Sequence, residues 1–363
     1  MEQRVYNFSA GPSMMPLEVL EQAQRELLCY PGAGCSVLEM SHRSEPFERI
    51  IGDAESALRR IMNIPDSYAV IFMQGGATTQ FSCVAMNLAG RGETMNYAVT
   101  GQFAGKAMDE GARWGNAVAV ASSKDKNFTY IPRITPDMLT PGAAYLHITG
   151  NNTIFGTTYH TLPETGDVPL VADWSSAILG EEIDVTRHAL IYAGAQKNMG
   201  PSGLAVVIIR RDLLERPIDP VVPIMLRYKV AADNGSMYNT PPTFSIYMAK
   251  LMYEWVEREG GVAEMERRNR KKAGILYDLI DSSKVFNNPV AHEDRSIMNV
   301  VFTLPTQEDT KAFIAMAKGR GLVNVKGHRA VGGCRASLYN GMPLEGVEAL
   351  AKCMHDFENG ERA

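Results

Sequence analysis

The chain has 363 residues, which is long enough for two domains or for one large and one small domain. Its composition is that of a soluble globular protein, 45% hydrophobic and 21% charged, and its net charge of -5 gives no electrostatic reason to expect nucleic acid or an acidic membrane surface as a partner. No run approaches the ~20 apolar residues of a membrane span, and the N-terminus lacks the order of a signal peptide.

Cysteine usage narrows the class of protein further. The five cysteines are an odd number at scattered spacings, with no CxxC pair and no histidines at metal-ligand intervals. We therefore expect reduced thiols in a cytoplasmic protein and no metal site.

The N-terminal segment is predicted to lead into a helix and then a basic loop. Residues 7–16 (NFSAGPSMMP) are rich in turn formers, and Pro16 is typical of the first position of a helix. Four leucines of this helix would share one face: Leu17, Leu20, Leu27 and Leu28. Next, His42 and Arg43 lie in a loop before a helix that Pro46 can start. Two such side chains suit an anion, with a solvated loop as the alternative.

A strand, a loop of small residues and a helix follow. Residues 68–73 (YAVIFM) are apolar and lead through residues 74–79 (QGGATT) into the helical residues 81–89. Small residues between a buried strand and a helix let backbone amides approach a phosphate, and the threonine hydroxyls add donors. The loop is neither a Walker loop nor a GxGxxG fingerprint, and a tight turn alone would also favour two glycines.

The alternation of strands and helices continues through the middle of the chain. Strands are predicted at residues 96–100, 117–121, 143–149 and 168–173, with a helix over 102–114 and a connecting segment with a short helix over 125–142. Nearly all-apolar strands that alternate with helices predict a mainly parallel sheet covered on both faces. Ligands bind at the carboxyl ends of such strands, where this pattern places Thr153, Asp173 and the loop at 74–79.

Lys197 lies in a polar loop between two apolar runs, residues 189–193 and 204–209, which are typical of buried strands. Lysine is seldom held so deep unless it is paired or its amine is used, because burial disfavours the ammonium form and favours a nucleophilic amine. Lys197 is therefore a candidate for covalent catalysis, with a surface loop lysine as the alternative.

Gly260 and Gly261 end a long predicted helix and form the candidate boundary between a large domain (16–260) and a small α/β domain (261–363). The segment 1–15 is expected to pack near the active site or the small domain. The small domain contains predicted helices at 262–282, 307–319 and 346–358 and predicted strands at 296–304, 322–325 and 334–339.

A glycine-rich stretch of the small domain, residues 327–340, brings together His328, Arg329 and Arg335. Two arginines beside a histidine can bind one phosphate and one carboxylate, and an ordinary exposed basic loop is the alternative.

A lysine, a strand-end carboxylate and a phosphate cradle in one crevice suit pyridoxal 5′-phosphate (PLP). Its aldehyde bonds to a lysine amine, its ring nitrogen needs a carboxylate to stay protonated, and its phosphate needs amides and hydroxyls. Each requirement has a candidate in this sequence.

Several motifs together resemble one family. SHR at 41–43, AGAQKNMGPSGL around Lys197, DNGSMYNTPPT at 233–243 and KGHRAVGGCRASLYNGMPLEGV at 326–347 resemble the phosphoserine aminotransferases of the class V aminotransferase group, and the likeness covers essentially the whole chain. It implies the α/β fold of PLP-dependent transferases of fold type I: a large domain with a mainly parallel central sheet covered by helices, plus a smaller C-terminal α/β domain. It also implies a homodimer with shared active sites.

The resemblance implies roles for individual residues. Lys197 would bond to the cofactor aldehyde and later carry a proton as general acid and base, and Asp173 would pair with the ring nitrogen. The other cofactor-binding residues would be Ala77, Thr78, Phe103, Thr153, Gln196, Asn239 and Thr240, of which the last two come from the other subunit in this family. The substrate pocket would consist of His42, Arg43, His328, Arg329 and Arg335, with Arg335 on the α-carboxylate.

Two positions depart from the family pattern. Phe103 lies where the family often has a tryptophan, which keeps an aromatic face but loses the indole NH. Thr78 lies where some members have an arginine, which leaves the phosphate pocket less basic by one group.

The implied reaction is a ping-pong transfer: L-glutamate gives its amino group to the cofactor, and 3-phosphohydroxypyruvate takes it to become O-phospho-L-serine in serine biosynthesis. Activity on the 4-phosphohydroxythreonine precursor in pyridoxine biosynthesis stays open. The alternatives are another class V enzyme, namely an alanine-glyoxylate aminotransferase or a cysteine desulfurase with Cys334 as the nearest acceptor thiol, and a non-catalytic scaffold of the same fold.

Overall fold

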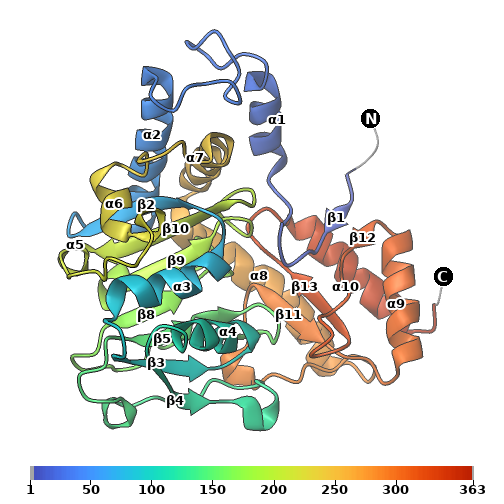
Figure 1. The fold of residues 1–363 in the computed structure, drawn as a ribbon. Coiled ribbons are helices and arrows are strands. Elements are labelled where there is room, and N and C mark those ends of the chain that lie inside the picture. Colours follow the sequence, from blue (N-terminus) through green and yellow to red (C-terminus); the bar gives the residue numbers. More distant parts are fainter. Residues whose placement is uncertain (1–3, 362–363) are drawn as a thin grey trace.

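A seven-stranded sheet forms the centre of the molecule (Figure 1). The computed structural model describes residues 4–361; residues 1–3 and 362–363, which belong to the predicted N-terminal segment and small domain, lie outside the described residues. In sheet order the strands are β2 (Tyr68–Gln74), β10 (Leu204–Arg210), β9 (Leu190–Gly194), β8 (Leu170–Asp173), β5 (Leu146–Thr149), β3 (Thr94–Val99) and β4 (Asn116–Ser122). Of these described strands only β10 runs antiparallel to its neighbours, which confirms the prediction of a mainly parallel sheet.

Helices cover both faces of this sheet (Figure 1). One face carries α2 (Glu45–Met62), α7 (Thr243–Arg258) and α8 (Gly261–Ser282), and the other carries α3 (Ala77–Leu88), α4 (Gln102–Gly111) and the short helices α5 (Arg211–Leu214) and α6 (Tyr228–Asp233). Side chains alternate along each strand: on β2, Val70 and Phe72 join the first core, whereas Ile71 and Met73 join the second. Both faces are thus sealed from water, which explains the nearly all-apolar strands.

A smaller group of elements follows α8. β11 (Asn299–Phe302) pairs antiparallel with β13 (Cys334–Ser337), and α9 (Gln307–Gly319) and α10 (Leu344–Glu358) pack beside them. Four phenylalanine rings meet between these elements, with centroids 5.3 to 6.1 Å apart: Phe286, Phe302, Phe313 and Phe357. This aromatic cluster is the centre of the C-terminal part of the core.

The two parts of the chain meet at a turn of two glycines. Gly260, which precedes α8, and Gly261, its first residue, have φ of 105° and 79°, a region that favours glycine. The N-terminal strand β1 (Tyr6–Asn7) pairs in parallel with β12 (Leu322–Val323). The N-terminal strand therefore packs against the C-terminal part of the molecule. The division of the chain into two domains at this turn stays a prediction.

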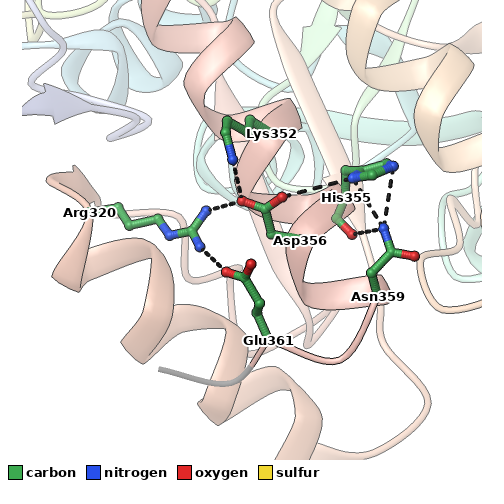
Figure 2. Close-up of polar contacts among 6 residues, drawn as sticks. All are labelled: Arg320, Lys352, His355, Asp356, Asn359 and Glu361. Atoms are coloured by element: carbon green, nitrogen blue, oxygen red, sulfur yellow. Dashed lines mark hydrogen bonds and ion pairs between the residues drawn. The ribbon is translucent and has the colours of Figure 1, made fainter.

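A network of charged side chains ties the end of α9 to α10 (Figure 2). Arg320, which follows α9, donates from Nη1 to Asp356 Oδ2 and from Nη2 to Glu361 Oε2, each at 2.6 Å. Lys352 Nζ lies 2.7 Å from the same Asp356 oxygen. Hydrogen bonds from Lys352 and Arg320 lower the pKa of Asp356 to about 2, so this carboxylate stays charged well into the acid range.

The first helix differs from its prediction. α1 (Leu17–Glu26) ends before Leu28, which is therefore no part of its surface. The buried residues of α1 are Val19 and Ala23, whereas Leu17 is 50% and Leu28 87% exposed. The predicted face of four leucines is wrong, because Leu27 and Leu28 lie beyond the end of α1, and of the four only Leu20 is half-buried against the core.

β4 also differs from its prediction. The sequence predicts a strand covered on both faces, but β4 lies at the edge of the sheet and, apart from the buried Ala121, its residues are exposed or half-buried. An edge strand pairs with only one neighbouring strand, and the small side chains of β4 offer little apolar surface for a helix to cover.

Two segments predicted as irregular or helical contain other structure. Residues 150–159 include a short hairpin, β6 (Asn151–Asn152) and β7 (Thr157–Thr158). In the connecting segment 125–142 the predicted short helix is a single 3-10 turn, Pro136–Met138. The 3-10 turns of the described chain are Lys124–Lys126, Pro136–Met138, Val185–Arg187, Ile224–Leu226 and His292–Asp294.

Candidate active site

Lys197 lies in the loop that joins β9 to the antiparallel β10, at the carboxyl end of β9. Its neighbour Asn198 is buried and fastens this loop. Asn198 Nδ2 donates to Ile178 O at 3.0 Å, and Asn198 Oδ1 accepts from the amide of Asn340 at 2.9 Å. The backbone that carries the lysine is therefore anchored to elements from both parts of the chain.

The Lys197 side chain is partly buried, unlike that of an ordinary surface-loop lysine. Its Nζ donates to Thr153 Oγ1 at 2.7 Å. Burial lowers the pKa of Lys197 to about 8; attraction to Asp173 opposes this shift, and repulsion by Arg335 adds to it. A neutral, nucleophilic amine is thus much more accessible near neutral pH than on an exposed lysine.

Asp173 is the last residue of β8 and is buried. Its Oδ1 accepts from the Ser175 amide at 2.9 Å and from Ser175 Oγ at 2.6 Å, and its Oδ2 takes no hydrogen bond from any described residue. Burial raises the pKa of Asp173, whereas Lys197 and the Ser175 hydrogen bonds lower it. A buried carboxylate with one oxygen that has no hydrogen-bond donor suits a cationic group of a ligand.

The small-residue loop after β2 leads directly into α3. Gly75 has a φ of +98°, and a Cβ there would lie 2.8 Å from Thr79 Oγ1, so the turn requires glycine. α3 begins at Ala77, earlier than the sequence predicts, which places Ala77 and Thr78 in its first turn. No described side chain caps this helix at Gly76, so its first amides remain for an anion.

Phe103, in the first turn of α4, lies beside the lysine. Lys197 Nζ is 5.8 Å from the centroid of the Phe103 ring. Lys106 Nζ, one turn further along α4, is 5.8 Å from the same centroid. An aromatic face at this place suits stacking on a planar ring.

A chain of buried hydrogen bonds supports Thr153. Thr153 Oγ1 donates to Ser176 Oγ at 2.9 Å, which donates to Asn151 O at 2.9 Å. Asn151 Nδ2 donates to Asn299 Oδ1 at 2.8 Å, and Asn299 Nδ2 donates to Tyr339 OH at 3.2 Å. The last four residues of this hydrogen-bond series are not predicted from the sequence, because isolated polar residues beside apolar strands have no spacing that marks them.

Arg335, on β13, is a partly buried cation. Its Nη1 donates to Thr153 O at 3.0 Å, and its Nε is buried without a hydrogen-bond partner. Burial lowers the pKa of Arg335, and no acidic side chain of the described chain forms an ion pair with it. An unpaired, desolvated guanidinium is costly, so this position suits a carboxylate supplied by a ligand.

His328 lies among positive charges. Burial lowers the pKa of His328, and repulsion from Arg335, Arg329 and Lys106 lowers it further. Two of the other predicted residues, Arg329 and Arg335, thus act electrostatically on His328, and Lys106 from α4 acts on it as well. Lys106 is not predicted from the sequence, since a single lysine on a helix belongs to no motif.

Four other predicted site residues, His42, Arg43, Asn239 and Thr240, do not contact Lys197 of the same chain. Arg43 Nε donates to His42 Nε2 at 3.3 Å in the loop before α2. Thr240 O accepts from Gln74 Nε2 at 2.9 Å, and Asn239 lines a cavity of about 140 Å³ with Gln74. No contact within the described part of the chain joins any of the four to the lysine.

The N-terminal segment packs on the lysine loop. The Ser13 amide donates to Gln196 O at 3.0 Å, and Ser13 Oγ donates to Lys197 O. A Cβ on Gly11 would lie 3.4 Å from the side chains of Gln196 and Lys197. Gln196 is thus enclosed between this segment and β9.

Within residues 4–361, no group of three or more His, Cys, Asp or Glu side chains is placed to hold a metal ion. All five cysteines have free thiols. No helix of this range combines the length and the apolar character needed to cross a membrane.

Comparison with known proteins identifies the family. The family described as "Aminotransferase class-V" matches residues 5–350. A phosphoserine aminotransferase of Geobacillus kaustophilus is 54% identical over 356 residues, 98% of each chain.

Solved structures of phosphoserine aminotransferases have the same fold as this chain. The phosphoserine aminotransferase of Bacillus circulans subsp. alkalophilus has a TM-score of 0.95 at 44% identity and covers 99% of both chains. A PLP-bound phosphoserine aminotransferase of Trichomonas vaginalis has a TM-score of 0.92 at 38% identity, covering 97% of this chain and 100% of that one. These matches confirm the resemblance and the fold class inferred from the motifs. The chain therefore belongs to the class-V aminotransferases and, within them, to the phosphoserine aminotransferase family.

Proposed function

We propose that the chain is a PLP-dependent phosphoserine aminotransferase. It transfers the amino group of L-glutamate to 3-phosphohydroxypyruvate and releases 2-oxoglutarate and O-phospho-L-serine, a step of L-serine biosynthesis. Relatives 54% identical to the chain carry this name. One observation carries the proposal: the amine of Lys197, with a pKa of about 8, lies beside a buried carboxylate and an unpaired arginine.

The residues at the site fit PLP. Lys197 offers an amine for its aldehyde, and Asp173 has an oxygen without a described donor for its ring nitrogen. The uncapped start of α3 at Ala77 and Thr78 suits its phosphate, and Phe103 offers a face for its ring. When bound, PLP supplies an electron sink for the breaking of a bond at the substrate Cα.

Lys197 carries the proton in this proposal. An amine with a pKa of about 8 is present in both protonation states near neutral pH, so it can accept a proton at the substrate Cα and return it. Thr153 orients this amine through its 2.7 Å hydrogen bond. Asp173 stabilises the positive charge that faces it, and the two Ser175 hydrogen bonds keep its carboxylate oriented.

The anionic ends of the substrates have separate partners. Arg335 would bind the α-carboxylate, because its guanidinium contacts Thr153 next to the lysine and has no acid of its own. His328 and Arg329 lie beside it and would bind the phosphate of one substrate and the distal carboxylate of the other. Both substrates would then present Cα to the same amine.

A homodimer with shared active sites is part of the proposal. His42, Arg43, Asn239 and Thr240 do not reach the lysine of their own chain, as expected if they serve the site of a second copy. Exposed leucines near them also favour a partner: Leu28 is 87% and Leu38 63% exposed. A cytoplasmic location, which the composition favours, belongs to the same proposal.

The alternatives fit the site less well. A cysteine desulfurase needs a reactive thiolate, but Cys334 is buried in β13 and burial raises its pKa to about 12. A non-catalytic scaffold would gain nothing from an unpaired Arg335 and a buried Asp173, whose desolvation costs stability. An alanine-glyoxylate aminotransferase has no phosphate to bind with the basic cluster around His328.

The test is turnover by purified protein with PLP, L-glutamate and 3-phosphohydroxypyruvate. Lys197→Ala should abolish turnover and the borohydride-sensitive absorbance of the bound cofactor, whereas Lys318→Ala, an exposed lysine on α9, should change neither. Full turnover by Lys197→Ala would refute the proposal. Transfer to glyoxylate but not to 3-phosphohydroxypyruvate would favour the alanine-glyoxylate alternative.

A further inference from the structure

One end of the site gathers positive charge without acid to balance it. Lys106, Arg329 and Arg335 all act on His328, and none of the three forms an ion pair with an acidic side chain of the described chain. Repulsion among these groups costs free energy in the absence of an anion. Such a cluster is a binding site for an anion with more than one negative charge.

Lys106 belongs to this cluster by its position on α4. It lies three residues after Phe103, so the two side chains share one face of the helix. Its Nζ lies 5.8 Å from the centroid of the Phe103 ring, and Lys197 Nζ lies 5.8 Å from the same centroid. The reactive amine and a second, exposed ammonium group therefore both lie near the same aromatic ring.

We propose that Lys106 binds the distal anionic group of the substrate and favours a phosphate over a carboxylate at that position. The proposal rests on the proposed function and names a specificity-determining residue for it. A phosphate monoester carries about 1.5 to 2 negative charges near pH 7, against one for a carboxylate, so an added cation stabilises it more. The Phe103 ring attracts the Lys106 ammonium group through a cation–π contact at 5.8 Å.

The first experiment measures binding without turnover. Inorganic phosphate is titrated into the PLP-loaded protein by calorimetry. Lys106→Gln should weaken phosphate binding by about three- to tenfold, the size expected for one partly exposed charge pair. Lys106→Arg, which keeps the charge, should restore most of the affinity.

A matched control is available on α9. Lys311 is also an exposed lysine at the fifth position of a helix, so Lys311→Gln makes the same chemical change away from the cluster. Lys311→Gln should leave phosphate affinity unchanged. Equal affinity in wild-type protein and Lys106→Gln would overturn the proposal, as would equal losses in both glutamine variants.

The second experiment separates the two substrates. Lys106→Gln should raise KM for 3-phosphohydroxypyruvate by about the same factor as it weakens phosphate binding, and should change KM for L-glutamate less than about twofold. An equal rise in both KM values would overturn the preference for phosphate.

A third measurement tests whether Lys106 lies close enough to His328 to affect its pKa. Lys106 lowers the pKa of His328, so Lys106→Gln should raise that pKa in an NMR titration, whereas Lys311→Gln should not. An unchanged His328 pKa would contradict the placement of Lys106. If wild-type protein binds phosphate through Lys106 but transfers no amine, the proposed function fails while the assignment of Lys106 as a phosphate ligand stands.

Discussion

Thr153 connects Lys197 to Arg335 through opposite ends of one residue. Its hydroxyl accepts from Lys197 Nζ at 2.7 Å, and its carbonyl accepts from Arg335 Nη1 at 3.0 Å. The spacing between the amine and the guanidinium is therefore fixed by a single buried residue, which the hydrogen bond to Ser176 holds in place. A substrate bound through its carboxylate would present Cα at a defined distance from the amine.

Replacing Thr153 by Val should remove its contact with Lys197 and keep its contact with Arg335. The change removes the hydroxyl that orients Lys197 but keeps the shape and the carbonyl that contacts Arg335. One lost hydrogen bond is worth about 1 to 1.5 kcal/mol, so kcat should fall by roughly tenfold while KM for L-glutamate changes little. Steady-state kinetics checks this, with Thr153→Ser as the variant that restores kcat. A larger change in KM than in kcat would contradict it.

Replacing Asp173 by Asn should abolish activity and raise stability. Burial raises the pKa of Asp173, so above that pKa the charged carboxylate destabilises the folded state, and a neutral amide relieves this cost. The Ser175 hydrogen bonds to Oδ1 can persist in the variant. Thermal unfolding of the cofactor-free protein at pH 7 should show a higher Tm, and turnover with PLP should be lost. A lower Tm would contradict the destabilising effect of the buried charge, and retained turnover would contradict the role of Asp173 in catalysis.

The lowered pKa of Lys197 makes two pH-dependent predictions. Cofactor-free protein should take up PLP faster as pH rises through about 8, since the neutral amine forms there, and the rate should then level off. Because the folded-state pKa lies below the ordinary lysine value, the unfolded chain binds more protons between about 8 and 10.5, so this group makes stability rise with pH in that window. Lys197→Met should lack that rise, and a rate that climbs to pH 10 without a plateau would contradict the first prediction.

Much of the fold follows from local patterns in the chain. The apolar runs that end at Asp173 and begin again after Lys197 are strands of the central sheet, because a strand buried on both faces excludes polar residues. Gly75 before α3 and the Gly260–Gly261 pair at the start of α8 have positive φ, which few other residues adopt. These signals are local, so the sequence alone reveals them.

Other features depend on contacts between distant segments. The burial of Val19 rather than Leu17 in α1 is decided by the position of α7, more than two hundred residues away. The electrostatic effect of Lys106 on His328 links α4 to a loop more than two hundred residues later in the chain. No periodicity or spacing in the sequence predicts interactions between such distant segments. The sequence therefore predicts Arg329 and Arg335 through a motif but not Lys106.

Replacing Phe313 by Ala should destabilise the C-terminal part of the core. Phe313 is fully buried and meets the rings of Phe286, Phe302 and Phe357 at 5.3 to 5.8 Å. Truncation of such a ring leaves a cavity and costs about 3 to 5 kcal/mol. Chemical denaturation should show this loss, whereas Phe313→Leu, which fills more of the cavity, should lose less. Equal stability of the alanine variant and wild type would contradict the packing described.

Replacing Leu28 by Glu should weaken the proposed dimer. Leu28 is 87% exposed in the single chain and lies in the segment that leads to His42 and Arg43. Burial of one leucine against a partner is worth about 1.5 to 3 kcal/mol, and a charge there adds a desolvation cost, so sedimentation should show more monomer. Activity should fall in parallel on dilution, because each site would lose the basic residues supplied by the second copy. Met138→Glu places the same charge on another exposed apolar residue, far along the chain, and should leave the dimer intact. A dimeric and fully active Leu28→Glu protein would mean that this surface faces solvent in the assembly.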